Sequence, residues 1–251
     1  MSEKISIRGV NVDNVSMKEA ITIIDEYASS KQFHCVFTPN AEIVQLCIED
    51  EKIRSIVNSA DLVVPDGAGV VLASKILNKH LKQKVAGVDL GENAIRLAVE
   101  KGYNVFFLGG KPGIAELAAK KLAEKHKGFT PVGTSDGYFQ KQGSESDQII
   151  DRINSLNTDI LFVCLGVPVQ ENWIIENKDK LKNVGLVMGL GGSLDAYSGN
   201  VKRAPDVFIK LNLEWFYRLI KEHKRIGRMM KLPKFVFGTI IYKLTGKDKK
   251  Q

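Results

Sequence analysis

The chain has 251 residues, 44% of them hydrophobic, which is enough to bury one sizeable core. Its net charge of +7 is unevenly distributed, because residues 201–251 hold fourteen Lys or Arg against four Asp or Glu. That segment therefore carries +10, and residues 1–200 carry −3. A near-neutral body with a cationic extension indicates a soluble domain joined to a region that meets an anionic surface.

Cysteine usage and hydropathy exclude several classes of protein. The three cysteines are odd in number and have no metal-site spacing, which argues against a disulfide scaffold or a zinc site. The N-terminus lacks the apolar stretch of a signal peptide, and no window reaches the roughly 18–20 apolar residues that a membrane span requires. We therefore expect a cytoplasmic protein, and the cationic segment at 201–251 leads us to expect that it associates peripherally with the inner face of the cell membrane.

The order of short apolar runs and amphipathic stretches predicts the fold. Runs rich in β-branched or aromatic residues predict strands at 5–10, 34–37, 61–64, 105–108, 159–165 and 185–188. Apolar residues at three- and four-residue spacing predict helices at 17–27, 68–77, 93–100, 114–126, 147–156 and 170–180. The alternation predicts an α/β, Rossmann-like, largely parallel sheet flanked by helices. Because no linker interrupts it, we expect one catalytic domain over residues 1–200 and a basic amphipathic helical appendage over 201–251.

The first polar clusters follow predicted strands, where open α/β sheets bind ligands. Asp66 lies between the run 62–65 and Gly67, so it is either a helix cap or a base. Thr38 and Asn40 follow the strand at 34–37 and precede a helix, so they form either a turn and cap or part of a binding pocket.

Gly109 and Gly110 follow the strand at 105–108 and open the next helix. Such a junction offers N–H groups and the positive end of a helix dipole to a diphosphate. The full dinucleotide-binding glycine spacing is absent, so a nicotinamide cofactor is only weakly indicated. Asp136 lies 23 residues after Gly113, where it reaches a ribose hydroxyl or forms an ordinary turn.

Two further clusters suggest a polar cleft with a glycine floor. Gln170 opens the helix after residues 166–168, and Gly192 and Asp195 follow the last strand. No Walker lysine motif, paired-histidine metal motif or nucleophile elbow is present, and the four histidines are scattered. A metal site is therefore not expected, and a diphosphate leaving group would depend on backbone dipoles and arginines.

The appendage supplies such arginines. A helix is predicted from Asp206 to about Met230, and the spacing of Arg218, Arg225 and Arg228 places them on one face with Lys221. The apolar segment at 234–243 is bracketed by lysines and fits a membrane interface better than nucleic acid. The alternative is a solvated basic helix with a small core segment. The apolar side chains of Phe208, Leu211 and Trp215 would allow subunits to pair in solution as a homo-oligomer.

The motifs together resemble the WecG/TagA/CpsF glycosyltransferases of bacterial surface-polymer synthesis, from about residue 7 to 229. The resemblance rests on eight segments in order: Thr-Pro-Asn-Ala-Glu at 38–42, Pro-Asp-Gly-x-Gly at 65–69, Val-Ala-Gly-Val-Asp-Leu at 85–90, Phe-Leu-Gly-Gly at 107–110, Gly-Tyr-Phe at 137–139, Gly-x-Pro-x-Gln-Glu at 166–171, Arg-Ala-Pro at 203–205 and Leu-Glu-Trp-x-Tyr-Arg-Leu at 213–219. The likeness is greatest to the TagA branch, which transfers N-acetylmannosamine from its UDP donor to undecaprenyl-pyrophosphoryl N-acetylglucosamine in wall teichoic acid assembly.

The resemblance implies an inverting transfer that requires neither a metal nor a cofactor, with a UDP-sugar as the donor substrate. Asp66 matches the proposed general base, and Thr38, Asn40 and Gln170 match polar positions of the pocket. Tyr138 belongs to the Gly-Tyr-Phe motif and joins the expected substrate-binding residues. Lys84 stands where the family usually has arginine, which retains the charge but loses the bidentate fork suited to phosphate.

The sequence leaves three alternatives. A relative of the same family would use the uronic acid of N-acetylmannosamine as its donor sugar. The strand, glycine turn and Asp136 would also suit a dinucleotide-dependent oxidoreductase. A non-enzymatic membrane adaptor would bind a nucleotide with its body and anionic lipid with its basic segment.

Overall fold

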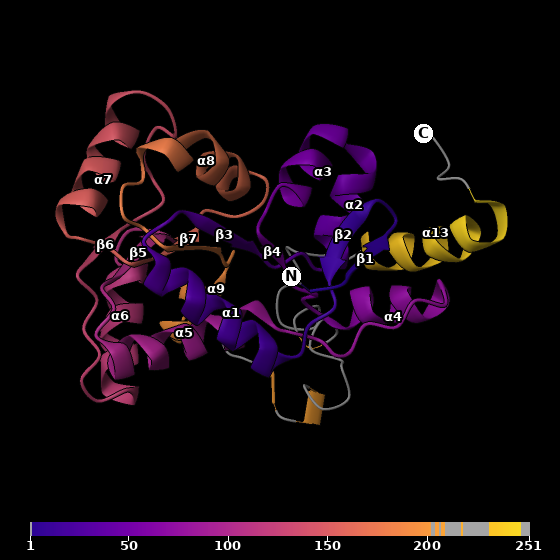
Figure 1. Ribbon diagram of the computed structural model, residues 1–251, viewed down its shortest axis with the longest axis horizontal. Helices are drawn as coiled ribbons and strands as arrows, with labels where there is room; N and C mark the ends of the chain where they lie inside the picture. The colour runs from indigo at the N-terminus through magenta and orange to yellow at the C-terminus, as the bar shows by residue number, and fades with distance from the viewer. Residues whose placement is uncertain (1, 202–203, 206, 209–216, 218–230, 247–251) are drawn as a thin grey trace. The chain divides into compact units, whose positions relative to one another are not determined.

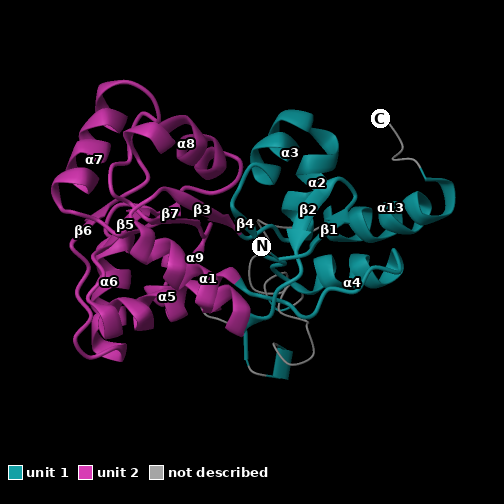
Figure 2. Ribbon diagram, in the orientation of Figure 1, with its two compact units in different colours: residues 1–17, 38–86, 203–251 teal, residues 18–37, 87–202 magenta. Residues whose placement is uncertain are grey.

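The computed structural model describes residues 2–201, 204–205, 207–208, 217 and 231–246 (Figure 1). The chain forms two compact units (Figure 2). Unit 1 comprises residues 1–17, 38–86 and 203–251, and unit 2 comprises residues 18–37 and 87–202. The predicted division into residues 1–200 and 201–251 stays a prediction.

Unit 2 is built on parallel strands, as the sequence predicts. The strands lie in the order β3-β8-β7-β5-β6, and every pair among them is parallel. Their bounds are β3 His34–Phe37, β5 Val105–Gly109, β6 Gly133–Ser135, β7 Ile160–Cys164 and β8 Leu186–Gly189. All residues of β5, β7 and β8 are buried, which explains why these segments are continuously apolar.

Helices cover both faces of these strands. Helices α1, α5 and α6 lie on one side, and α7 and α8 lie on the other (Figure 1). The bounds are α1 Met17–Ser30, α5 Gly87–Lys101, α6 Ile114–Lys125, α7 Ser144–Ser155, α8 Val169–Asn177, the 3-10 turn η1 Lys178–Lys180 and α9 Ser193–Tyr197. The α/β prediction with a parallel sheet flanked by helices is therefore confirmed.

Unit 1 contains a hairpin where the sequence predicted a single strand at 5–10. Strands β1 Lys4–Ile7 and β2 Val10–Asp13 pair antiparallel. Arg8 and Gly9, with φ of 49° and 91°, form the two-residue turn between them. Two consecutive positive φ angles match the twist of a hairpin, so the apolar run is divided between two strands.

The rest of unit 1 is mainly helical. Its remaining elements are α2 Ala41–Glu49, α3 Glu51–Asn58, β4 Leu62–Val63, α4 Ala68–Ile76 and α13 Lys231–Thr245. Helix α13 packs against α2 and α4. The appendage therefore has a C-terminal helix, as predicted, and Phe235 and Thr239 are buried on one side of it. Within the described ranges, every helix is too short or too polar to cross a bilayer.

Candidate active site

Backbone hydrogen bonds join the three polar segments of unit 1. The N–H of Asp66 donates to the carbonyl oxygen of Pro39 over 3.2 Å, and the N–H of Val85 donates to that of Pro65 over 2.9 Å. These bonds bring the 38–40 turn, Asp66 and Lys84 into one cluster. Thr38, Asn40, Asp66 and Lys84 thus lie on neighbouring backbone segments, although the sequence separates the first and last by more than forty residues.

The structure distinguishes the local roles of Asn40 and Asp66. Asn40 caps α2, because its Oδ1 accepts the N–H groups of Glu42 and Ile43 over 2.9 and 3.1 Å. Helix α4 has Gly67 as its N-cap, so Asp66 lies one residue before the cap and is only partly buried. Asp66 thus stands at a strand-to-helix junction, and a Cβ on the next residue, Gly67, would lie 3.7 Å from the Asn40 Cβ. Thr38 is buried at the same junction.

In unit 2, the backbone of Gly109 and Gly110 is held by β7. Gly109 pairs with Cys164, and the N–H of Gly110 donates to the Cys164 carbonyl oxygen over 3.2 Å. That N–H is therefore already engaged within the protein. A diphosphate at this junction would instead meet the start of α6, whose N-cap is Gly113.

Asp136 and Tyr138 lie next to this glycine pair. The N–H of Gly137 donates to the carbonyl oxygen of Gly110 over 2.8 Å. Asp136 Oδ1 accepts the N–H of Tyr138 over 2.7 Å, which is the local turn that the sequence offered as its ordinary role. Tyr138 is 69% exposed, so its ring is open to solvent beside the end of β5.

Gln170 links α8 to the turn that follows β8. We call residues 189–192 the glycine turn. Gln170 is buried, and its Oε1 accepts the N–H of Gly191 over 2.9 Å, while its Nε2 donates to Glu171 Oε1 over 2.8 Å. The predicted pocket residue therefore uses both ends of its amide to hold neighbouring protein groups.

Gly192 completes the glycine turn and precedes α9. Its φ is −85°, which any residue adopts, and a Cβ atom there would meet no atom within 4 Å. Neither backbone conformation nor packing against the described residues requires glycine here, and a glycine leaves this backbone open to close approach. Asp195, one turn further on, accepts a bond from Asn200 Nδ2 over 3.1 Å.

The clusters around Gly109 and the glycine turn meet at Cys164. Burial raises the pKa of its thiol to about 12, against the opposing effect of the Leu194 and Ser193 backbone groups. A thiol with this pKa stays protonated at neutral pH, so Cys164 belongs to the buried core and does not act as a nucleophile.

The buried state of Glu171 is a feature that periodicity did not reveal. The residue is 2% exposed, and burial raises the pKa of its carboxyl to about 7, although the hydrogen bond from Gln170 opposes the shift. Among the described residues, its buried Oε2 has no hydrogen-bond partner. Because Glu171 follows a glutamine at the start of a helix, the sequence alone gives it the appearance of an ordinary first-turn acidic residue.

A separate groove of about 180 Å³ lies in unit 2 between the 141–143 segment and helices α7 and α8. Two of its charged lining residues, Asp147 and Lys180, pair with each other over 2.7 Å. None of the predicted site residues lines it.

Two further predictions concern the metal requirement and the C-terminal arginines. In the described part of the chain, no group of three or more His, Cys, Asp or Glu is placed to hold a metal ion. Metal-independent transfer remains a prediction. Arg218, Arg225 and Arg228 lie outside the described residues, as do Leu211 and Trp215 of the predicted oligomer contact.

Comparison with known proteins defines the class of protein. The sequence profile of the glycosyl transferase WecG/TagA/CpsF family matches residues 5–249. The chain therefore belongs to this family and is a glycosyltransferase.

Two relatives extend the comparison. The chain is 32% identical over 236 residues to the N-acetylglucosaminyldiphosphoundecaprenol N-acetyl-beta-D-mannosaminyltransferase of Staphylococcus aureus (strain MW2), covering 93% of this chain and 91% of the relative. It is 35% identical over 236 residues to the protein of the same name from Bacillus subtilis (strain 168), covering 94% of this chain and 90% of the relative.

Proposed function

We propose that this chain transfers N-acetylmannosamine from its UDP donor to N-acetylglucosaminyl-diphosphoundecaprenol, with inversion, in wall teichoic acid assembly. The observation that carries the proposal is similarity to N-acetylmannosaminyltransferases along 93–94% of the chain. The site clusters support it, because the aligned length includes both the Asp66 junction and the glycine turn. A lipid-linked acceptor would also explain why a near-neutral body carries a cationic segment of +10.

In this mechanism Asp66 acts as the general base. Its carboxylate takes the proton of the acceptor hydroxyl as that oxygen forms a bond to the anomeric carbon of the donor sugar. The bond from the anomeric carbon to the diphosphate breaks in the same step, and UDP leaves with the electron pair. A single displacement needs one base and a stabilised leaving group, and it forms no covalent sugar intermediate.

The leaving diphosphate needs positive partners in place of a metal ion. Unit 2 offers the start of α6 for this role, and unit 1 offers Lys84, Arg218, Arg225 and Arg228. A helix N-terminus concentrates N–H groups and partial positive charge, which suits a diphosphate. Lys84 would act as a point charge, since a lysine lacks the bidentate fork of arginine. Tyr138 would offer its exposed ring to the uracil base.

Helix α13 offers a surface for the membrane. Phe237, Ile240 and Leu244 are 66%, 40% and 80% exposed, and their spacing of three and four residues places them on one face. Phe235 and Thr239, which are buried, lie on the opposite face. The helix would therefore lie in the interface with one face on unit 1 and the other in the acyl boundary.

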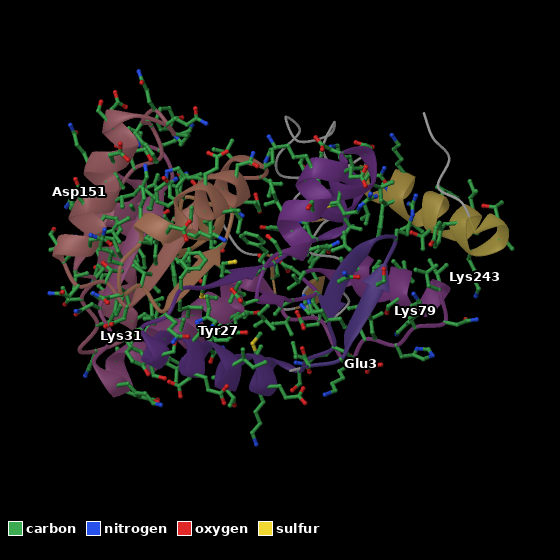
Figure 3. The ribbon with its side chains drawn as sticks, turned by 45° about the horizontal axis from the view of Figure 1, so that its top comes forward. Glu3, Tyr27, Lys31, Lys79, Asp151 and Lys243 are labelled. Carbon is green, nitrogen blue, oxygen red and sulfur yellow. The ribbon has the colours of Figure 1, made fainter. Side chains whose placement is uncertain are left out.

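Lysines flank the exposed apolar face of α13. Lys234 Nζ lies 2.9 Å from Glu49 Oε1, and Lys243 Nζ donates to Asn78 Oδ1 over 3.0 Å. Figure 3 labels Lys243 near Lys79, which follows α4 in the chain. Lysines beside an apolar face can hold their charged ends at the level of anionic headgroups.

The proposal is tested by UDP release from UDP-N-acetylmannosamine in EDTA, with and without a lipid-pyrophosphoryl N-acetylglucosamine acceptor. Acceptor-dependent release would support a metal-independent transferase with this donor. Release from the uronic acid donor alone would replace the donor assignment. Reduction of NAD, or nucleotide binding with no turnover of either donor, would reject the transferase proposal in favour of an oxidoreductase or an adaptor.

Replacing Asp66 by Asn tests the base. We expect turnover to fall by about two to four orders of magnitude, because a general base contributes that much, while the dissociation constant for UDP changes little. The matched control is Asp61→Asn, an exposed carboxylate five residues earlier in the same segment. Near-normal turnover of Asp66→Asn would reject the assignment.

A further inference from the structure

A continuous chain of hydrogen bonds runs from Glu171 to the glycine turn. Glu171 Oε1 accepts from Gln170 Nε2 over 2.8 Å, and Gln170 Oε1 accepts from the Gly191 N–H over 2.9 Å. Gln170 and Gly191 are 21 residues apart in the sequence, so this amide connects the first turn of α8, after β7, to the turn after the neighbouring strand β8. Its environment determines which way the amide points.

The direction of the Gln170 amide matters because its two ends have opposite hydrogen-bonding character. With Oε1 toward Gly191, the turn's N–H has an acceptor. With the amide reversed, Nε2 would face that N–H, and two donors would oppose each other. Glu171 Oε1 selects the first arrangement when it carries no proton, because it then accepts a bond from Nε2, whereas the Gln170 carbonyl oxygen has no hydrogen to donate.

The second oxygen of Glu171 shows that packing alone does not account for this residue. Glu171 is 2% exposed, and no group in the described part of the chain forms a hydrogen bond with its buried Oε2. A buried carboxyl oxygen in this state costs stability, and an apolar side chain of similar size would avoid the cost. Polar groups kept at such a cost are characteristic of functional sites.

The hydrogen bonds from Glu171 through Gln170 hold the glycine turn, whose backbone is open to approach. Gly191 and Gly192 have free space where a Cβ atom would lie. Gly189 is different, because a Cβ there would lie 3.1 Å from Gln170 Nε2. The amide of Gln170 therefore packs against the start of the turn and bonds to its middle, while the end of the turn stays accessible.

We infer that Glu171 is a positioning residue: it orients the Gln170 amide, and the amide holds the glycine turn in the shape that receives the nucleoside diphosphate donor. The inference rests on the proposed function for the identity of the ligand. The relay from Glu171 to Gly191 is independent of that identity and is testable in the ligand-free protein. Glu171 itself takes no part in bond making or breaking.

Two conservative variants separate the acceptor from the charge. Glu171→Gln removes the charge but keeps a carbonyl oxygen at the same reach, so the Gln170 amide stays oriented. Glu171→Asp keeps the charge but withdraws the acceptor by one methylene. Glu176→Gln is the matched control, because Glu176 is an exposed carboxylate on the same helix.

The first measurement is hydrogen exchange of the Gly191 amide in the full chain without ligand. We expect Glu171→Asp to speed its exchange by about tenfold or more, while Glu171→Gln and the control stay close to wild type. Amides of β7 and β8 report whether the sheet remains intact. Unchanged Gly191 exchange in Glu171→Asp, or equal acceleration in both Glu171 variants, would overturn the relay.

The second measurement is calorimetric titration with UDP, accompanied by KM and kcat for the donor. Glu171→Asp should weaken UDP binding and raise KM by about fivefold or more with a smaller change in kcat, because a distorted turn weakens ground-state binding. Unchanged UDP affinity alongside accelerated Gly191 exchange would overturn the role in ligand binding. If wild type itself fails to bind UDP, the proposed function fails, and the exchange experiment still judges the relay.

Discussion

At the scale of single residues, the buried Glu171 carboxyl makes stability depend on pH. Burial raises its pKa from 4.5 to about 7, so between these values the folded state binds a proton that the unfolded state has lost. The free energy of unfolding must therefore fall as the pH rises from about 4.5 to 7. The shift corresponds to about 3 kcal/mol, all of it lost above pH 7.

The expected result is a difference between wild type and Glu171→Gln. At pH 8 the variant should be more stable than wild type by up to about 3 kcal/mol, and at pH 4.5 this advantage should vanish. Urea unfolding at pH 4.5, 6, 7 and 8 measures both proteins. Because other titrating groups are common to both, their effects cancel in the difference, and parallel pH curves would contradict the raised pKa.

Gly192 provides a prediction in which stability and binding separate. Replacing it by Ala should leave stability unchanged or raise it by about 0.4–1 kcal/mol, because the site has open space and an ordinary φ. The added methyl group should weaken UDP binding by obstructing the approach to the backbone. Thermal unfolding and calorimetry test the two parts, and equal UDP affinity would remove Gly192 from the site.

Single residues also show why the sequence alone does not decide whether a polar side chain has a local structural role or binds a ligand. Asn40 and Asp136 each had a local role and a ligand role open to them, and the hydrogen bonds to Glu42, Ile43 and Tyr138 establish the local ones. An Asn40 Oδ1 engaged in a cap leaves its Nδ2 for a ligand. Cap and turn chemistry are therefore readable from the sequence, whereas the use of the remaining polar atoms depends on what lies opposite them.

At the scale of elements, helix α4 is held close to its neighbours by a glycine. A Cβ at Gly69 would lie 2.7 Å from the Ala41 Cβ on α2 and 2.8 Å from Leu232 Cδ1 on α13. Three helices of unit 1 thus converge where the second residue of α4 has no side chain. Gly69 belongs to the Pro-Asp-Gly-x-Gly motif, and the close packing of these helices explains the glycine without any role in the reaction.

Replacing Gly69 by Ala should therefore destabilise unit 1. Overpacking a tight contact costs about 1–3 kcal/mol, which exceeds the gain of about 1 kcal/mol from helix propensity. Lys75→Ala, at an exposed position of the same helix, is the control and should be close to neutral. Differential scanning calorimetry measures both, and a Gly69→Ala protein as stable as the control would show that the helices shift apart without cost.

Element types were predicted more accurately than their bounds. Strands β3, β5, β7 and β8 were predicted close to their observed bounds because buried parallel strands are continuously apolar. The short strand β6 was missed, since Gly133–Ser135 is only half-buried and has no apolar run. The start of α5 was placed at residue 93 instead of Gly87, because glycines in its first turns mask the helical pattern.

At the scale of the whole molecule, the charge asymmetry predicts salt-sensitive membrane association. The cationic segment should bind vesicles containing anionic lipid, and the exposed face of α13 should add an apolar contribution. Raising the salt concentration from about 0.05 to 0.5 M should weaken binding, because the Debye length shortens severalfold. Sedimentation with vesicles of defined composition measures the bound fraction.

The apolar part is tested by the double variant Phe237→Ser and Leu244→Ser. Both side chains are more than 60% exposed, so the fold should tolerate the changes while the bound fraction falls several-fold. Leu117→Ser, on an exposed position of α6, controls for lost surface hydrophobicity elsewhere. Unaltered binding of the double variant would assign membrane association to charge alone.

The sequence by itself determined the α/β class, the alternation of most strands and helices, and the family, because these depend on local periodicity and on the order of short motifs. Tertiary structure decided which polar atoms are engaged and which groups are buried. It joined Gln170 to Gly191, placed Arg8 within 5.9 Å of the Tyr242 ring, and buried one side of α13 while leaving the other exposed. Partners and burial come from segments far apart in the chain, so no local pattern encodes them.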